Sequence, residues 1–371
     1  MNTLHNTSPF PFRVVLAAMA FGAAVSPSAV DAAQTVRLVP NTYPTIQSAI
    51  NAANAGDKIV VRRGIYVEQL VIGKNLDITG TGAGSTIVRA PAALVPGGAG
   101  RTAIVEIRGG ATVSVSQLTV SGPGAGTCEA GALRDGILVW DGAHLELSSA
   151  AVIHIHDTPL AACFHSGHGI TVGVPFESTA TATIRHTDIS DYSLGGIIVF
   201  NEGSSATITD NVITGAGAST VVATSGIEVI LGAVGTISHN VVSANACGSP
   251  DLGCGRDYFN EFQIAGITAG GPGTVITHNV LSGNQVGIYA FDGAELSHNT
   301  FVDNDYFGLL VDGGSVTSSH DRISGGFGGV WVVAAFADTT VVLDKLKVSG
   351  TSAAPIQTLE CCGFSATITQ K

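Results

Sequence analysis

A glycine followed by isoleucine, or by a close variant, recurs along most of this chain and constrains its fold more than any other feature. The last four of these glycines are 21 residues apart, and each begins a short apolar strand. A unit this short cannot bury its apolar face alone, so neighbouring units must stack on one another. The pattern therefore predicts a solenoid of coils with about 20 residues each. The glycines are Gly136, Gly169, Gly196, Gly226, Gly266, Gly287, Gly308 and Gly329.

A second repeated position carries Asn before two apolar residues. Stacking places identical positions of neighbouring coils about 4.8 Å apart, which is the spacing between strands. Buried Asn side chains would then satisfy one another and the nearby backbone along a ladder. The predicted ladder residues are Asn211, Asn240, Asn279 and Asn299, with Thr187 and Asp321 as variants.

Histidines form two groups in the sequence. His186, His239, His278, His298 and His320 each precede a ladder position, which predicts an outward column on the surface. Metal ligands must converge on one point, and a straight column offers two at most. The second group is His154, His156, Asp157, His165 and His168, whose spacing matches no zinc motif. We therefore assign no metal ligands from the sequence.

The N-terminal part predicts a leader and then a short helix. Arg13 precedes an apolar run from Val14 to Val25, which is typical of a secretory signal peptide and too short to span a bilayer. We expect residues 1–33 to be this signal and residues 34–371 to be one domain of a protein that is secreted or periplasmic. Between Pro44 and Gly56, apolar residues follow a helical stripe, which predicts a short helix that caps the solenoid.

The coil repeats, together with the run from Pro44 to Ile50 and the segments Gly56-Asp57 and Gly64-Ile65-Tyr66, resemble the pectin-lyase-like superfamily. The resemblance implies an all-β fold, a right-handed parallel β-helix with a short N-terminal capping helix. It implies activity less specifically, because the superfamily includes lyases, glycoside hydrolases, esterases, epimerases and non-enzymatic surface proteins.

Charge and cysteine content limit the partners and the compartment. The formal net charge is −12, and the only basic residues between Asp135 and Asp344 are three arginines, so no basic patch for nucleic acid is expected. No later segment is apolar and long enough to be a membrane span. Six cysteines in an exported chain predict disulfides, and the sequence leaves 15 possible connectivities open, of which the following pairs are the ones the repeat suggests. Cys247 and Cys254 would staple one loop, stacking would bring Cys128 and Cys163 together, and Cys361-Cys362 lies at the last coil.

Four insertions interrupt the repeat, and all of them precede a Gly-Ile strand. Stacking places them on one edge of the solenoid, where they could wall a groove over those strands. The insertions span Gly122 to Arg134, Asp157 to Gly167, Gly215 to Ser225 and Ala244 to Ala265.

Strand alternation sorts the residues of this groove. If Ile137, Ile197, Ile227, Ile267 and Ile288 point inward, their neighbours point outward. Exposed aromatic rings with nearby carboxylates suit a sugar chain, because apolar sugar faces stack on rings. The alternative is that the inserted loops cover these rings and make them core. The predicted substrate-binding residues are Trp140, Phe200, Tyr289, Phe291 and Trp331 on the strands, and Arg256, Asp257 and Glu261 in the largest insertion.

One segment resembles polygalacturonase-type glycoside hydrolases. Gly167-His168-Gly169 is similar to their Gly-His-Gly segment, and Asp135 corresponds to the second residue of their Asp-Asp pair, whereas Arg134 replaces the first. The resemblance implies that Asp135 is a general acid and that His168 tunes it. A glycine-rich turn is the alternative reading of the segment.

These observations predict a monomeric protein that binds or modifies an extracellular polysaccharide or cell-surface glycan, as a lyase or a hydrolase. Asp135, His168 and Glu228 are the catalytic candidates. The cofactor is unknown, and Ca²⁺ stays open because calcium-assisted lyases neutralise a substrate carboxylate. The alternative is a non-catalytic surface or envelope protein that acts as a scaffold.

Overall fold

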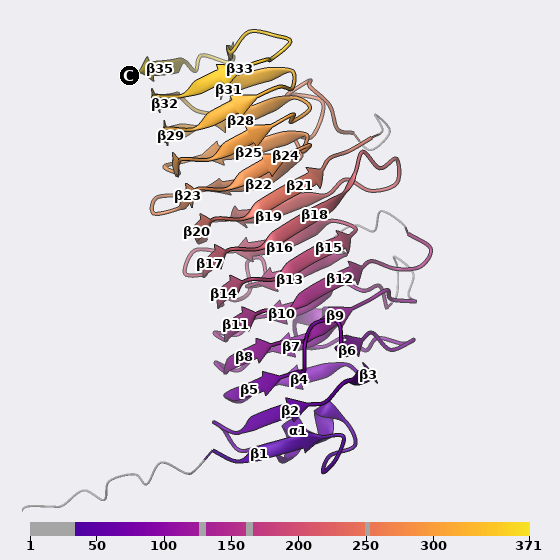
Figure 1. Ribbon diagram of the computed structural model, residues 1–371. Helices are drawn as coiled ribbons and strands as arrows, with labels where there is room; N and C mark the ends of the chain where they lie inside the picture. Colours follow the sequence, from indigo (N-terminus) through magenta and orange to yellow (C-terminus); the bar gives the residue numbers. More distant parts are fainter. Residues whose placement is uncertain (1–33, 126–130, 161–165, 249–252) are drawn as a thin grey trace, which may run out of the picture. The chain divides into compact units, whose positions relative to one another are not determined.

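A computed structural model describes residues 34–125, 131–160, 166–248 and 253–371. Within these residues the chain forms three long sheets in which neighbouring strands are parallel (Figure 1). From β3 onward, successive strands visit the three sheets in turn, so each coil contributes one strand to each sheet. The predicted leader, Cys128, Cys163 and His165 lie outside the described residues.

The sheet that carries the Gly-Ile repeat is called the Gly-Ile sheet, and its described strands are β4 (Leu70–Ile72), β7 (Ala103–Ile107), β10 (Asp135–Val139), β13 (His168–Val172), β16 (Gly195–Phe200), β19 (Ser225–Ile230), β22 (Ala265–Gly270), β25 (Val286–Phe291), β28 (Phe307–Asp312), β31 (Gly328–Ala334) and β34 (Ile356–Glu360). The sheet whose strands follow the ladder positions is called the Asn-ladder sheet, with β3 (Gly64–Val67), β6 (Thr86–Arg89), β9 (Thr119–Ser121), β12 (Ala151–Ile155), β15 (Asp188–Tyr192), β18 (Val212–Gly217), β21 (Val241–Asn245), β24 (Val280–Ser282), β27 (Thr300–Val302), β30 (Arg322–Ser324) and β33 (Lys347–Ser349).

The third sheet is the longest among the described residues. It comprises β1 (Val36–Val39), β2 (Lys58–Val61), β5 (Leu76–Thr79), β8 (Thr112–Ser116), β11 (His144–Ser148), β14 (Thr181–Arg185), β17 (Ser205–Thr209), β20 (Val234–Ser238), β23 (Val275–Thr277), β26 (Glu295–Ser297), β29 (Gly314–Ser319), β32 (Thr339–Asp344) and β35 (Ala366–Gln370).

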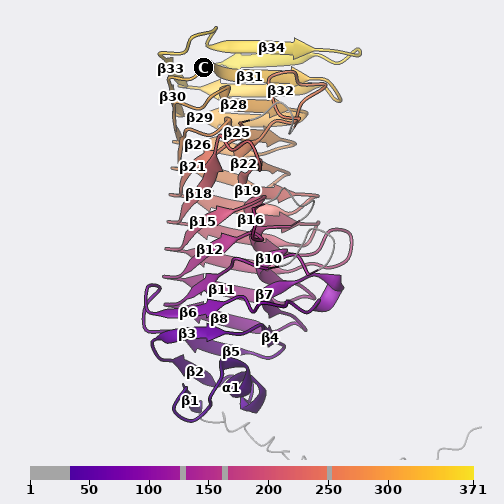
Figure 2. The same cartoon turned by 90° about the vertical axis from the view of Figure 1, so that its right-hand side faces the viewer.

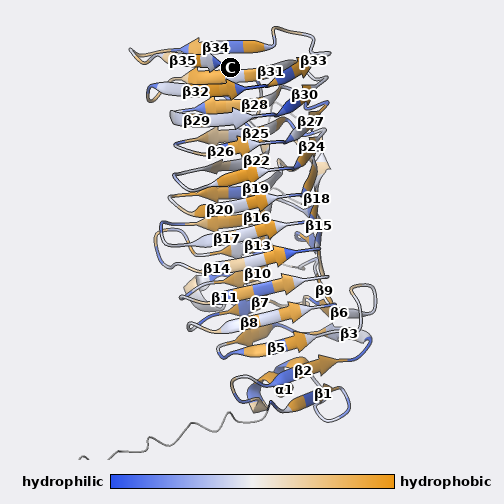
Figure 3. Cartoon of the chain, turned by 60° about the vertical axis from the view of Figure 1, so that its left-hand side comes forward, coloured by the Kyte–Doolittle hydropathy of each residue, from blue (hydrophilic) through white to orange (hydrophobic). Residues whose placement is uncertain are grey.

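The core lies inside the coils, and the isoleucines of the repeat form one row of it. Ile137 is in register with Ile170, then with Ile197 and Ile227 on the following strands, and all four are fully buried. Burying such a side chain contributes about 1.5–3 kcal/mol, so a stacked row adds stability with each coil. Hydrophobic and hydrophilic residues alternate along many strands, as Figure 3 shows. The predicted inward direction of the isoleucines is confirmed.

The glycine before each isoleucine is required by close packing. A Cβ on Gly136 would lie 2.6 Å from the carbonyl oxygen of Gly169 and 2.9 Å from the Val152 side chain. Gly169 and Gly196 face the next coil at similar distances. Because any larger residue would push neighbouring coils apart, the repeat keeps glycine at this position.

The predicted Asn ladder is present and buried. The side-chain amide of Asn211 donates to Asn240 Oδ1 at 3.0 Å, and Asn240 donates to Asn279 in the same way at 3.0 Å. The ladder continues through Asn299 to Asp321, and burial raises the pKa of the Asp321 carboxyl. Each amide therefore keeps its hydrogen bonds without water, which removes the cost of burying a polar group.

A second ladder was not predicted from the sequence. Asn245 Nδ2 donates to Asn284 Oδ1, and Asn284 Nδ2 donates to Asn304 Oδ1, both at 3.1 Å. Each of these residues follows a residue of the first ladder by five positions. That fixed interval was visible in the sequence.

The predicted histidine column is present for four of its five residues, because Asp210 occupies this position in the coil between His186 and His239. The rings of His239, His278, His298 and His320 are exposed and stack nearly parallel, with centroids 4.8–5.0 Å apart. These four residues have positive φ values between 56° and 58°, which marks the bend before the Asn-ladder sheet.

One α-helix, α1 (Ile46–Ala52), and one short 3₁₀ turn (Gly98–Gly100) are present among the described residues. Thr45 caps α1 by accepting from the Ser48 backbone N–H at 3.1 Å, and Ile46, Ala49 and Ile50 are buried. The helix lies beside β1 and β2 (Figure 2). Its role as a cap that closes the solenoid stays a prediction.

Two cysteine pairs are joined in the described part of the chain. Cys247 pairs with Cys254, as the sequence predicted, with Cα atoms 6.3 Å apart, and Cys361 pairs with its neighbour Cys362. No helix in the described residues has the length and apolar character that crossing a membrane requires.

Candidate functional site

A hollow of about 360 Å³ opens on the outer side of the Gly-Ile sheet, over β19, β22 and β25. Glu228 and Tyr289 come from the strands, whereas Tyr258, Glu261 and Gln263 come from the insertion that precedes β22. The arrangement follows from strand alternation. Ile227 and Ile288 point inward, so the residues after them, Glu228 and Tyr289, point outward. The hollow lies on the sheet over which the groove was predicted, and the groove itself stays a prediction.

Two tyrosine hydroxyls converge on one carboxylate at the edge of this hollow. Tyr258 donates to Asp312 Oδ2, and Tyr289 donates to the same oxygen at 3.1 Å. The two hydroxyl oxygens are 3.2 Å apart. Burial, together with the Asp312 carboxylate, raises the pKa of both tyrosines, so both hydroxyls stay protonated at neutral pH. Asp312 Oδ1 is buried and has no hydrogen-bond partner among the described residues.

Glu228 is the carboxyl of the hollow whose pKa is shifted by burial. Burial raises the pKa of its carboxyl, and a hydrogen bond with Ser225 opposes that shift. Within the described part of the chain, Glu228 forms no ion pair. A carboxyl with a raised pKa can hold a proton for transfer to a leaving group.

A second hollow of about 390 Å³ shares Tyr289 with the first and adds Phe291 and Asp312. Thus Tyr289 and Phe291, both predicted to bind substrate, lie on accessible surface. Their ring centroids are 6.0 Å apart in an edge-to-face arrangement. Such paired rings are suited to contact the apolar face of a sugar.

The three predicted residues of the largest insertion have different surroundings. The Arg256 guanidinium lies over the Phe327 ring, 4.3 Å from its centroid. Asp257 accepts from the side-chain amide of Asn260 at 2.7 Å and its backbone N–H donates to Glu261 at 2.8 Å, so both carboxylates support the insertion itself. Only Glu261 of the three also lines the hollow.

Asp135 and His168 lie elsewhere on the same sheet, in a closed environment. Asp135 is fully buried and accepts from Arg101 through Nε at 2.8 Å and Nη2 at 2.6 Å. Thr171 donates to the same carboxylate at 2.5 Å, and His168 Nδ1 is 3.7 Å from it. Arg101 thus neutralises the carboxylate that the sequence nominated as a general acid. The catalytic roles of Asp135 and His168 stay predictions.

Three of the aromatic residues that were predicted to bind substrate are largely covered. Phe200 is 9% exposed, and Trp331 is 8% exposed beneath Tyr258, whose ring is 5.7 Å away. Trp140 is partly buried and its indole N–H donates to Glu106 at 2.9 Å. For Trp331, a residue of the largest insertion packs over the ring, as in the alternative that inserted loops cover the rings. Their contact with sugar stays a prediction.

Tyr258 and Asp312 were missed by the sequence analysis. Asp312 could have been found by alternation, because it lies two residues after the outward Leu310, which is in register with Tyr289. Tyr258 gave a weaker signal, since its approach to Asp312 depends on how the insertion folds over the sheet.

A family model described as the right-handed β-helix region matches residues 172–346. No curated protein matches the sequence. Among solved structures, an alginate lyase from Paenibacillus sp. str. FPU-7 has a TM-score of 0.50 at 14% identity, with 84% of this chain and 95% of that chain covered.

Two further solved structures share the fold. The catalytic domain of a GH87 α-1,3-glucanase has a TM-score of 0.52 at 15% identity, covering 92% of this chain and 70% of that one. A periplasmic alginate epimerase, AlgG, has a TM-score of 0.50 at 10% identity, covering 91% and 85%. The match to the family model and these solved structures agree with the right-handed parallel β-helix fold that the described residues form.

Proposed function

We propose that this protein is exported as a monomer and cleaves or otherwise modifies an extracellular polysaccharide in the hollow over β19, β22 and β25, with Glu228 as the proton donor. One observation carries the proposal. A carboxyl whose pKa is raised by burial lies in the same hollow as two tyrosine hydroxyls that are held by a carboxylate. Perturbed groups that share a hollow are typical of sites where protons are transferred.

The solved structures support a carbohydrate substrate through what their names describe. The alginate lyase, the α-1,3-glucanase and the alginate epimerase all act on polysaccharides, and they share this fold. A fold alone does not define a reaction, so the choice among these reactions depends on the residues of the hollow.

The charge of the hollow favours hydrolysis of a neutral or weakly charged glycan. Its described lining contains Glu228 and Glu261 and neither Lys nor Arg. A lyase that acts on uronates needs a cation or Arg to neutralise the substrate carboxylate, and Arg256 is instead stacked over Phe327. Protonated Glu228 would give its proton to the leaving oxygen as the glycosidic bond breaks, while water adds to the anomeric carbon and releases a proton to the solvent. The Tyr289 ring would contact a sugar face.

The test is a screen of the protein against neutral polysaccharides and polyuronates, with and without Ca²⁺. Reducing ends and absorbance at 235 nm are followed together. We expect new reducing ends without rising absorbance on a neutral glycan. Rising absorbance on a polyuronate would show β-elimination instead of hydrolysis. A requirement for Ca²⁺ would then identify the positive charge that neutralises the substrate carboxylate.

A non-catalytic scaffold is the second candidate, and the covered rings of Phe200 and Trp331 favour it. Inactivity of folded protein on the whole panel would support this alternative. Retention on an immobilised glycan without turnover would indicate binding alone.

A further inference from the structure

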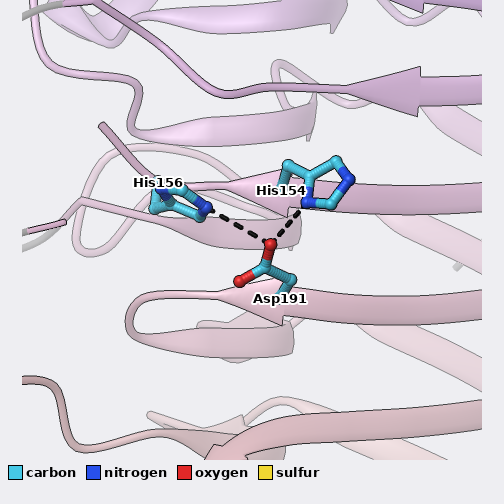
Figure 4. A group of neighbouring side chains, drawn as sticks. All are labelled: His154, His156 and Asp191. Atoms are coloured by element: carbon cyan, nitrogen blue, oxygen red, sulfur yellow. Dashed lines mark hydrogen bonds and ion pairs between the residues drawn. The ribbon is translucent and has the colours of Figure 1, made fainter. Parts of the chain in front are cut away.

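A second chemical cluster lies away from the hollow, at the edge of the Asn-ladder sheet. His154 lies in β12, His156 follows the last residue of that strand, and Asp191 lies in β15 of the next coil. The three side chains converge on one point, as Figure 4 shows. Each contributes one potential ligand atom, and these atoms lie within 4.8 Å of one another. Among the described residues, this is the cluster of three or more His, Cys, Asp or Glu side chains whose potential ligand atoms lie this close together.

Strand register brings the cluster together. β12 and β15 pair so that Ile153 is opposite Ser190 and Ile155 is opposite Tyr192, which places His154 opposite Asp191. Both residues have positive φ values, 58° and 54°, and both are about half exposed. At the same position the coils before and after carry Gly122 and Gly215. The cluster is therefore a local feature of these two coils and not part of a repeating column.

Hydrogen bonds already set the ligand atoms. Nδ1 of His156 lies 2.9 Å from the backbone carbonyl oxygen of Asp157, which can only accept, so Nδ1 carries the proton. The lone pair is then on Nε2, which lies 3.3 Å from Asp191 Oδ2. A backbone carbonyl that fixes the tautomer of a histidine is the usual outer partner of a metal-binding imidazole.

Asp157, whose carbonyl is the outer partner of His156, is itself held in place. Asp157 is 5% exposed, and its carboxylate accepts from the Leu133 backbone N–H at 3.1 Å. His156 is the least exposed of the three side chains, at 16%. His154 Nδ1 hydrogen bonds to the same Asp191 oxygen, so both rings face one carboxylate atom.

We propose that His154, His156 and Asp191 bind a divalent first-row transition metal ion, with Zn²⁺ as the best fit. Two imidazoles and one carboxylate are the donor set that zinc accepts, whereas Ca²⁺ prefers oxygen ligands alone. The protein supplies three ligands, which leaves a coordination position for water or another ligand. The bound ion would join two successive coils at the base of the Asp157–Gly167 insertion. This site is independent of the proposed glycan-modifying site.

The histidine column provides a built-in comparison. His278 and His298 stack in parallel with centroids 4.8 Å apart, so their nitrogens point in the same direction and do not converge. A variant at His298 therefore removes an exposed histidine without touching the proposed ligands. It is the matched control for general histidine affinity.

The experiment uses the full chain without an affinity tag, after chelator treatment and dialysis. Zn²⁺ is titrated by calorimetry, and Co²⁺ serves as a second probe whose visible absorption reports coordination. We expect one ion per chain and a higher Tm with Zn²⁺. His156→Ala and Asp191→Ala should each weaken binding by at least about 100-fold, because even loss of an outer partner costs 10- to 100-fold.

His298→Ala should bind Zn²⁺ as the unmodified protein does. Circular dichroism confirms that each variant is folded, and Asp191→Glu, which keeps a carboxylate, should retain part of the affinity. The proposal is overturned if the unmodified protein binds neither Zn²⁺ nor Co²⁺ stoichiometrically. It is equally overturned if His156→Ala and Asp191→Ala bind Zn²⁺ undiminished, since the ion would then lie elsewhere.

Discussion

Asp135 and Glu228 lie on the same sheet, on strands β10 and β19, and their surroundings are opposite. Asp135 is fully buried and paired with Arg101 through two hydrogen bonds. Glu228 borders a hollow, and burial raises its pKa, with no ion pair from the described residues to compensate. A buried carboxylate with a fixed cationic partner stabilises a fold only as long as both partners remain. The Glu228 carboxyl, which has no such cationic partner among the described residues, can take up and release a proton.

The difference teaches that a motif resemblance and a chemical environment can point to different residues. The Gly-His-Gly resemblance indicates Asp135, whereas the hollow, the two tyrosines and the shifted pKa indicate Glu228. Four measurements can sharpen or break this contrast.

Glu228→Gln should have the largest effect. Removal of the proton donor is expected to lower turnover of the glycan by about 10²- to 10⁴-fold, while the free energy of unfolding stays the same or rises. Initial rates and chemical denaturation are measured together. Glu202→Gln, on the exposed surface, is the control. Full activity of Glu228→Gln would remove this residue from the reaction.

Asp135→Asn should act on stability instead. The change leaves Arg101 buried without its partner, and breaking a buried ion pair costs about 3–5 kcal/mol. Chemical denaturation gives the free energy of unfolding, with the exposed Asp188→Asn as the control. If Asp135→Asn remained stable but lost turnover, the resemblance to the polygalacturonases would describe the mechanism after all.

Tyr289→Phe should have a smaller effect on stability. It removes one of the two hydroxyls that donate to Asp312, and a hydrogen bond to a charged group contributes about 1.5–3 kcal/mol. Tyr66→Phe loses one bond to a neutral carbonyl and should cost about 1 kcal/mol. Equal losses in the two variants would show that Asp312 does not depend on its tyrosines.

The smallest expected effect is the contribution of Glu228 to the pH dependence of stability. The pKa of Glu228 is raised in the folded protein, so the folded state binds more protons than the unfolded state above pH 4.5. Stability should therefore fall as pH rises above this value, and Glu228→Gln should remove that component. Denaturation midpoints between pH 4 and pH 8 measure it. An identical pH profile in Glu228→Gln would mean that the shift is absent.

Much of the fold could be predicted from the sequence because its signals are local and repeated. The Gly-Ile spacing predicted the coils, alternation predicted that Ile137 and its counterparts point inward, and the Asn positions predicted the buried ladder. The histidine column followed from the same register. Each of these inferences needs only the assumption that like positions stack.

The candidate sites depended on contacts that no period encodes. Arg101 reaches Asp135 across 34 residues, His154 reaches Asp191 across 37, and Tyr258 reaches Asp312 across 54. Alternation could say that Glu228 and Tyr289 point outward. It could not say that the largest insertion would leave these two beside a hollow while covering Trp331.

The sequence by itself therefore determined the solenoid, its core and the direction of the side chains along the repeated strands, because stacking energy is set by repeated apolar and Asn positions. Only the tertiary structure decided which outward charges are neutralised and which are left to react. The reason is physical. Arg101 lies in the segment before β7 and Tyr258 lies in the largest insertion, and both reach carboxylates on other coils. Desolvation and ion pairing depend on such neighbours rather than on the residue's place in the repeat.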